Sequence, residues 1–190
     1  AYIADRFTGL RVIDVSDPEN LREEDPVFEG RSMVRLAREG DRLYVGAIYP
    51  VQLLIMDIVN PHIPAVVGQV NIPGVGGHAV TGVAVQDGYA YMVTDDRSSY
   101  SGTLQVIDIS DPANAAAVGT LAALPGQPKG VAVAGNWAYV PAGAAGLLLI
   151  DISDPTNPIL VDTFGDPDPN DAVATGFFSE ITLSGHFAYL

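Results

Sequence analysis

The chain has 190 residues, a formal net charge of −14 and no cysteine. A surface this acidic repels phosphate backbones, which argues against nucleic-acid binding, and the missing cysteines exclude a disulfide framework, a thiolate metal site and a cysteine nucleophile. No apolar run reaches the ~18 residues of a membrane-spanning helix, so we expect no membrane insertion by this segment.

Four near-copies of one phrase run along the chain and decide the fold class. They occupy residues 9–18, 51–61, 102–112 and 146–155, the last reading Gly-Leu-Leu-Leu-Ile-Asp-Ile-Ser-Asp-Pro. A second phrase with a central tyrosine keeps step with the first, at residues 1–3, 43–45, 90–92, 138–140 and 188–190. Such periodicity means one structural unit repeated, and four short strands joined by tight turns every ~40–50 residues are typical of a β-propeller blade.

The first three predicted units are one partial blade and two full blades. The chain opens in the second strand of a partial blade that covers residues 1–28. A full blade over 32–70 has its first hairpin turn at Gly40-Asp41, a pair that tolerates positive φ. The next full blade covers 78–121, and we expect a long loop in it over 94–101.

The fourth unit, residues 129–164, gives the clearest reading of a blade. Its predicted strands are 130–134, 137–140, 146–152 and 159–164. The third of these is apolar almost throughout, which favours burial on both faces between neighbouring blades. Two strands of another partial blade close the chain over 178–190.

These units hold seventeen predicted strands, one more than a closed ring of four four-stranded blades. The second strand is present at both ends of the chain, so the two partial blades do not merge into one. We therefore expect an all-β fold: a single β-propeller segment, incomplete, cut from a ring of five or more blades, with further sequence beside it.

The repeated phrases resemble the LVIVD repeat, a family named after its buried third strand. The segments Gly9 to Pro18 and Gly146 to Pro155 carry the resemblance most clearly, and it extends over essentially the whole chain. The copy from Val51 to Pro61 departs, because Asn60 replaces the turn aspartate and the leading glycine is absent. The resemblance implies a β-propeller that is exported or attached to the surface of bacterial or archaeal cells, with no established activity.

The polar residues that recur in every unit are predicted to be structural. The repeated aspartates are Asp14, Asp57, Asp108 and Asp151, and we expect each to accept backbone N–H groups of the following turn. Asp17, Asp111 and Asp154 stand before prolines and are expected to cap the same turns. The repeated tyrosines, Tyr2, Tyr44, Tyr91, Tyr139 and Tyr189, are expected to pack their rings between blades.

One acidic loop breaks the repeat and is a candidate calcium site. Asp166, Asp168, Asn170 and Asp171 alternate with prolines, and hard oxygen ligands at this density suit calcium. The central glycine and the distant bidentate glutamate of a standard calcium loop are missing, so a stiff acidic turn is the alternative. We expect no other cofactor.

Four non-repeating polar residues stand near the predicted starts of first strands, at the mouth of the central channel. They are His78, Arg35, Lys129 and Glu180, and we consider them a candidate ligand pocket. The alternative interpretation of these residues is solvated strand ends. If they carry chemistry, the protein is a propeller enzyme, a hydrolase or lyase with its site at the channel mouth.

Aromatic and charged residues gather in the loops after the second strands. They are Arg6, Phe7, Tyr49, Arg97 and Tyr100, and loops of this kind on a rigid scaffold usually carry recognition. The leading hypothesis is therefore a non-catalytic binding or structural module of a cell-surface or extracellular protein. Such a module mediates contact with a protein partner or self-assembly.

Overall fold

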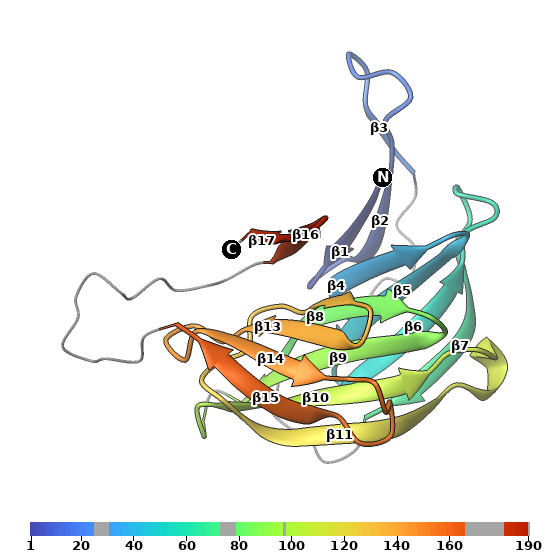
Figure 1. Ribbon diagram of the computed structural model, residues 1–190. Helices are drawn as coiled ribbons and strands as arrows, with labels where there is room; N and C mark the ends of the chain where they lie inside the picture. The colour runs from blue at the N-terminus through green and yellow to red at the C-terminus, as the bar shows by residue number, and fades with distance from the viewer. Residues whose placement is uncertain (25–30, 73–78, 97, 166–180, 190) are drawn as a thin grey trace.

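The computed structural model describes residues 1–24, 31–72, 79–96, 98–165 and 181–189 (Figure 1). Regular structure in these residues is almost entirely β, with one short 3₁₀ turn, η1 (Pro112–Asn114). The described residues contain seventeen strands in antiparallel sheets, which confirms the predicted all-β fold.

Each sheet is a meander whose strands follow one another in sequence order. The first sheet contains β1 (Tyr2–Asp5), β2 (Gly9–Asp14) and β3 (Arg22–Glu23). The second contains β4 (Ser32–Glu39), β5 (Arg42–Ile48), β6 (Gln52–Asp57) and β7 (Ala65–Asn71). The third contains β8 (Ala79–Gln86), β9 (Tyr89–Asp96), β10 (Ser101–Asp108) and β11 (Ala116–Pro125). The fourth contains β12 (Ala132–Ala134), β13 (Trp137–Pro141), β14 (Leu147–Asp151) and β15 (Ile159–Phe164), and the last contains β16 (Thr182–Ser184) and β17 (Phe187–Tyr189).

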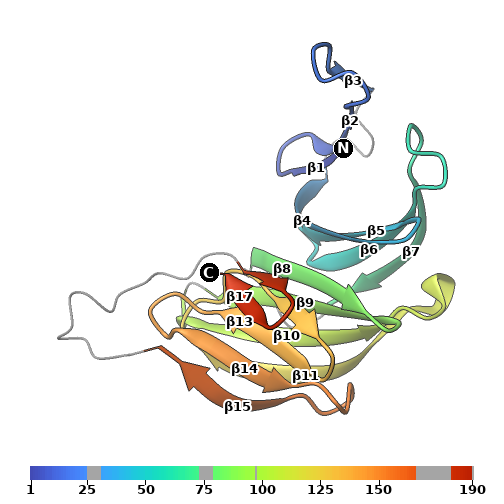
Figure 2. The same ribbon diagram turned by 45° about the horizontal axis from the view of Figure 1, so that its top comes forward.

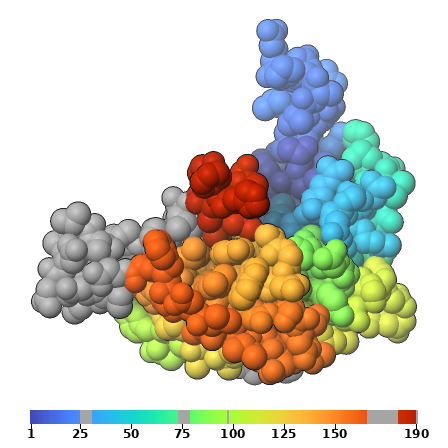
Figure 3. Space-filling view, in the orientation of Figure 1, coloured from blue at the N-terminus to red at the C-terminus, as the bar shows by residue number. Residues whose placement is uncertain are grey.

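The sheets formed by the described residues follow one another in an open arc and do not close into a ring (Figure 2). Their first strands lie on the inside of the arc, where β4 contacts β8, β8 contacts β12 and β12 contacts β16. The first sheet, in blue, projects away from the rest of the molecule in the space-filling view (Figure 3). Because first strands line the inside, a residue near the start of such a strand is placed where a propeller has its central channel.

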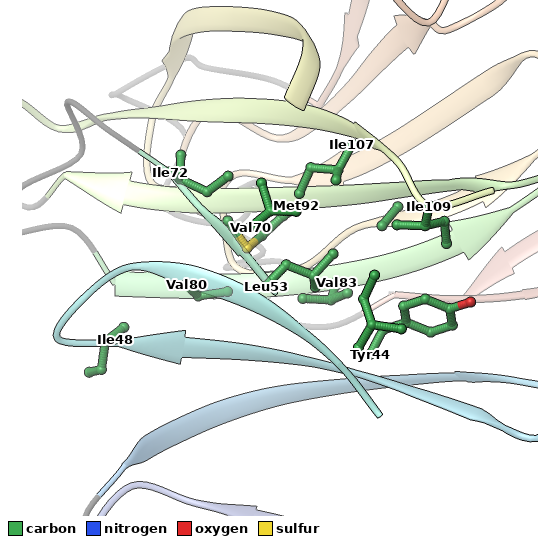
Figure 4. Packing of buried hydrophobic residues seen from close by; sticks show 12 residues of the cluster. Tyr44, Ile48, Leu53, Val70, Ile72, Val80, Val83, Met92, Ile107 and Ile109 are labelled. Atoms are coloured by element: carbon green, nitrogen blue, oxygen red, sulfur yellow. The ribbon is translucent and has the colours of Figure 1, made fainter. Parts of the chain in front are cut away.

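The hydrophobic core is divided into three clusters, each between two neighbouring sheets. Figure 4 shows the cluster between the second and third sheets, where Leu53 of β6 packs with residues of β8 and β9. Successive side chains of a strand point to opposite faces. Leu53 and Ile55 therefore join the third sheet, while Leu54 and Met56 join the first. The prediction that the apolar third strand is buried on both faces is confirmed for β6. In β14 it holds in part, because Leu148 and Ile150 are buried against the third sheet whereas Leu149, on the other face, is only partly buried.

Besides the hydrophobic clusters, neighbouring sheets are joined by a second kind of contact, in which a proline turn packs against a glycine. Gly68 lies at a β-bulge in β7, and a Cβ atom there would overlap the backbone carbonyl of Pro112 in the next sheet. Gly119 occupies the same bulge position in β11 and meets the carbonyl of Pro155 in the same way. The proline turns that follow β10 and β14 therefore each pack against the fourth, outer strand of the preceding sheet. We call the glycine position that receives such a turn its seat.

The expected loop over 94–101 is wrong in extent. Thr94, Asp95 and Asp96 belong to β9 and pair with residues 101–103 of β10, because the antiparallel ladder simply continues past the point where the other blades turn. The connection is therefore confined to residues 97–100. The aromatic Tyr100 still lies in it, at a tighter turn than the sequence predicted.

Candidate functional site

The repeated aspartates at the ends of the third strands are turn residues. In every copy, one carboxylate oxygen accepts the backbone N–H two residues further on, at 2.8–2.9 Å, from Ser16, Val59, Ser110 and Ser153. Hydrogen bonds from the Ser110 hydroxyl and backbone hold the pKa of Asp108 below its ordinary value. The pKa of Asp151 is lowered by the same kind of bonds from Ser153, led by the backbone N–H. The predicted structural role is confirmed.

The second carboxylate of each turn also has the predicted capping role. Asp17 accepts from the backbone of Glu19, Asp111 from Ala113 and Asp154 from Thr156. In the divergent copy Asn60 takes this place and accepts from His62 at 3.2 Å. An amide oxygen therefore serves where the other copies have a carboxylate.

The repeated tyrosines are packed between sheets where both neighbouring sheets are present. Tyr44 and Tyr91 are buried in the clusters on either side of the third sheet, and burial raises the pKa of each hydroxyl. Tyr2 donates its hydroxyl to the carbonyl of Pro61, a contact between the first two sheets. Tyr189 does not follow the prediction, because its side chain is 60% exposed in the last, two-stranded sheet.

The loops between second and third strands present aromatic side chains to solvent. Phe7 is 86% exposed, Tyr49 is 78% exposed and Tyr100 is 70% exposed. Each belongs to a different sheet, in the loops β1–β2, β5–β6 and β9–β10. Because every sheet is the same antiparallel meander, these loops open on one side of the arc, which we call the loop face, and the proline turns lie on the other. Arg6 is also exposed on the loop face, and Arg97 lies outside the described residues.

Two of these loops are held in shape by a carboxylate at the end of the second strand. Asp5 accepts the backbone N–H groups of Phe7 and Thr8 at 2.7 and 2.8 Å. These bonds, led by the one from Thr8, lower the pKa of Asp5. Asp96 accepts from the backbone and hydroxyl of Ser98 and from the Ser99 hydroxyl.

Backbone strain marks the aromatic residues of two loops. Tyr49 and Tyr100 have φ values of 62° and 52°, in the left-handed region that bulky residues rarely adopt. Such strain persists only where the surrounding structure enforces it, and it is concentrated at functional positions. The loop face therefore combines exposed rings with a backbone that is fixed before any partner arrives.

Two of the predicted channel-mouth residues line one hollow. Arg35 of β4 and Lys129, just before β12, border a space of about 290 Å³ together with Thr81 of β8 and Thr182 of β16. The structure thus brings these two cations to the same inner surface of the arc. His78 and Glu180 lie outside the described residues, so the four-residue pocket remains a prediction.

Both cations of the hollow make contacts across a joint between sheets. Arg35 donates its Nε to the carbonyl of Thr81 at 2.6 Å and Nη1 to the carbonyl of Val34 at 2.7 Å. Lys129 places its Nζ 3.4 Å from a carboxylate oxygen of Asp95 and 3.3 Å from the side-chain oxygen of Gln127. Asp95 is only 1% exposed, so Lys129 joins the fourth sheet to a buried charge in the third.

A larger hollow, about 420 Å³, lies between the first two sheets. Three of its polar side chains are engaged in local contacts: Asp14 holds the turn that follows it, and His62 places Nδ1 2.9 Å from Glu24. His186 borders a third hollow, of about 310 Å³, between the fourth and last sheets. The histidines that the structure describes, His62 and His186, therefore lie in different hollows.

The calcium prediction cannot be placed on the structure. Asp166, Asp168, Asn170 and Asp171 lie outside the described residues. Within the part of the chain that is described, no group of three or more histidine, aspartate or glutamate side chains is arranged to hold a metal ion. The described residues also include no helix that is long and apolar enough to cross a membrane.

Sequence reasoning missed Asp95 and Thr81 as parts of the inner surface. The sequence predicts a loop at Asp95, yet this residue belongs to β9 and its carboxylate is buried against the fourth sheet. The signal in the sequence is a Thr-Asp-Asp run at the end of the second strand, which no other copy of the repeat has at that point. Thr81 acts through its backbone carbonyl, which no side-chain pattern reveals.

Comparison with protein families identifies the repeat. The profile described as LVIVD repeat matches residues 1–25, 76–122 and 125–166, which together make up more than half of the chain. The chain belongs to the LVIVD repeat family. This is a family of β-propeller repeats, so the family and the antiparallel four-stranded sheets agree.

Solved structures with the same fold are distant in sequence. The computationally designed Ika8 protein is 12% identical with a TM-score of 0.62, over 98% of this chain and 50% of its own. Apo AztD from Citrobacter koseri is 16% identical with a TM-score of 0.53, over 85% of this chain and 44% of its own. This LVIVD repeat chain thus spans about half the length of the structures it matches. A comparison with curated proteins finds no match.

Proposed function

We propose that this LVIVD repeat chain is a non-catalytic binding module that contacts a protein partner through its loop face. The observation that carries the proposal is the row of exposed rings, Phe7, Tyr49 and Tyr100, at the same loop of three successive sheets. Tyrosine and other aromatic residues are favoured anchors at protein interfaces. Single exposed apolar residues are common, but here an exposed ring recurs at one repeated position of three successive sheets.

The fixed shape of the loops supports the proposal. Asp5 and Asp96 hold the first and third of these loops through hydrogen bonds to loop atoms. A loop that is already ordered loses less conformational entropy on binding, which strengthens association. The repeated carboxylates at the ends of the third strands are engaged in turns, which leaves the loops as the part of the scaffold that varies between blades.

The same proposal places the protein outside the cytoplasm, at the cell surface or in the extracellular medium. Family resemblance motivates this location. Protease treatment of intact cells tests it, because an exported protein is digested while a cytoplasmic control protein survives. Survival of the full-length protein in intact cells would contradict this part of the proposal.

Site-specific photo-crosslinking in the native host tests the loop face. The photoreactive residue p-benzoylphenylalanine is placed singly at Tyr49 and at Tyr100, and the control positions are Val59 and Ile63. The control side chains are each 70% exposed but lie at the proline turns, on the opposite side of the arc.

We expect both loop positions to crosslink to the same protein and the control positions not to do so. A common product is expected because the two loops belong to adjacent sheets and face the same way. Equal crosslinking from all four positions, or none from the loops, would overturn the proposal. If the common product is a second copy of this chain, the contact is self-assembly.

A further inference from the structure

The hollow on the inside of the arc is bordered by two basic residues, although the chain as a whole is strongly acidic. The chain carries 23 acidic residues against nine basic ones, and residues 43–190 hold only Arg97 and Lys129 as basic residues. Even so, its single lysine and Arg35 border the same space of about 290 Å³. No aspartate or glutamate is among the described residues that line it.

Arg35 is fixed in place without a carboxylate partner among the described residues. Its Nε and Nη1 donate to the carbonyls of Thr81 and Val34, which uses two of the five N–H donors of a guanidinium. Both acceptors are neutral, so no carboxylate among the described residues compensates the positive charge of Arg35. The two bonds fix the plane of the guanidinium group, and its planar set of N–H donors matches two oxygens of a carboxylate or phosphate.

Lys129 adds a second cation whose position is also fixed. Its backbone N–H donates to Pro141 at 2.8 Å, and Asp95 holds its ammonium group at 3.4 Å. An ammonium group has three donors, and the contacts with Asp95 and Gln127 are at the long end of the hydrogen-bond range. Asp95 offsets one unit of charge from behind the hollow, and Arg35 contributes a second positive charge among the described lining residues.

Backbone atoms reach this surface because two glycines line it. A Cβ atom at Gly82 would press on the backbone of Gly130 and Val131, so the strands approach closely only without a side chain there. The volume of the hollow lies at the lower limit of small-molecule sites, which are ~300–1,000 Å³. It therefore suits a ligand of a few non-hydrogen atoms.

We propose that this hollow binds a small oxyanion, a carboxylate or phosphate group, through Arg35 with Lys129 as the second contact. The site is independent of the loop face, since it is built from first strands and not from the aromatic loops. The oxyanion has two sources that the same chemistry serves: a free small anion, or an acidic side chain of a polypeptide.

Isothermal titration calorimetry on the full chain tests the site. The probes are inorganic phosphate, succinate and a blocked Gly-Glu-Gly peptide, at one fixed ionic strength, with dimethyl succinate as the neutral control. The variants are R35Q and, as a matched control on the same strand, R38Q. Arg38 donates Nε to Gly40 and borders the other hollow, so R38Q removes equal charge from a different place. Thermal unfolding of each variant confirms that it is folded.

We expect at least one anionic probe to bind the wild-type chain and R38Q alike, and R35Q to bind it about tenfold more weakly or worse. Dimethyl succinate is expected not to bind. Preference for the peptide identifies an acidic polypeptide as the source, and preference for succinate or phosphate a free anion. The proposal is overturned if no anion binds the wild-type chain, or if R35Q and R38Q weaken binding equally. Either result leaves the crosslinking prediction for the loop face unaffected.

Discussion

Single carboxylates at the ends of strands stabilise the turns of this molecule. One oxygen of Asp108 or Asp151 accepts a backbone N–H that would otherwise have no partner in the turn. The ionised form is the better acceptor, which is why hydrogen bonding lowers the pKa of both residues. The pKa of Asp14 is lowered in the same way, with the backbone N–H of Ser16 as the largest cause, so protonation weakens three turns in different parts of the chain.

We expect the melting temperature to fall as the pH drops below about 3.9, the ordinary value for an unfolded aspartate. The folded pKa values are lower, so the stability from these carboxylates is present above that pH and is lost as the pH falls through the folded values. The variant D108N/D151N keeps an acceptor oxygen, as Asn60 does naturally, but it cannot titrate. Differential scanning calorimetry from about pH 6 to about pH 3 should show a smaller loss for the variant than for the wild type.

A matched variant separates this effect from net charge. E19Q/E39Q removes two negative charges from exposed side chains, as D108N/D151N does, and leaves the carboxylates of the turns in place. Its melting temperature should follow the wild-type pH dependence. If D108N/D151N and the wild type lose stability in parallel, the turns are not what titrates.

The contact between Lys129 and Asp95 predicts a measurable cost when the lysine is removed. Asp95 is almost fully buried, so the variant K129M leaves a desolvated carboxylate with one charged partner fewer. We expect a loss of about 1–3 kcal/mol in the free energy of unfolding, measured by urea denaturation. R38M, at an exposed arginine, should change it by no more than about 0.5 kcal/mol.

A double-mutant cycle decides whether the loss belongs to this pair. The variant D95N/K129M should lose less stability than the sum of the single variants, since the amide tolerates burial without a counter-ion. Additive losses would show that Lys129 acts elsewhere in the structure.

Strands of neighbouring sheets are joined by two devices, an apolar cluster and a proline turn on a glycine. The cluster follows from the alternation of side chains along β6, β10 and β14. The turn requires that the outer strand of the preceding sheet has no side chain where the proline carbonyl arrives. Gly68 and Gly119 satisfy this requirement, and Asp162 occupies the same bulge position in β15.

We expect G68A and G119A to lower the free energy of unfolding by about 1–3 kcal/mol each, because a Cβ atom forces the proline turn away from the sheet. G130A is the control: its Cβ would meet only Pro141, at an ordinary contact distance of 3.7 Å. Chemical denaturation measures all three variants. A control that is as damaging as G68A would mean that loss of glycine flexibility, not the seat, is responsible.

The sequence was informative where the cause of a structure is local. The turns, the burial of the third strands and the packing of Tyr44 and Tyr91 follow from residues within one repeat. The seats at Gly68 and Gly119 could not be predicted, because their role depends on a turn more than thirty residues away in the next sheet. The contact between Lys129 and Asp95 could not be predicted either, because the two residues are distant in sequence and meet only where the third and fourth sheets pack together.

At the scale of the molecule, an open arc of sheets carries a large excess of negative charge. The net charge of −14 is unevenly spread, since seven of the nine basic residues lie in the first 42 positions. Mutual repulsion of like charges opposes a compact state. Stability of the arc therefore depends on the ions around it.

We expect the melting temperature at neutral pH to rise when sodium chloride is increased from about 0.01 M to about 0.15 M, because the screening length falls from about 30 Å to about 8 Å. Differential scanning fluorimetry measures the shift, with tetramethylammonium chloride as the second salt. The two salts should act alike if screening is the cause. A fall in melting temperature with salt would mean that ion pairs such as Arg11–Glu23 outweigh the repulsion.

The contact between a proline turn and a glycine seat is directional, because each turn packs against the sheet that precedes it in the chain. The third sheet offers its turn to the sheet before it and a glycine to the sheet after it, so duplication of such a unit creates a copy that fits at both ends. Growth of the protein by gene duplication then needs no new interface, which explains how near-identical phrases accumulate in one chain. Asp162 interrupts this rule at β15, where the bulge position carries a side chain. Lineages with a glycine at this position are expected to have a unit that follows with the standard proline turn.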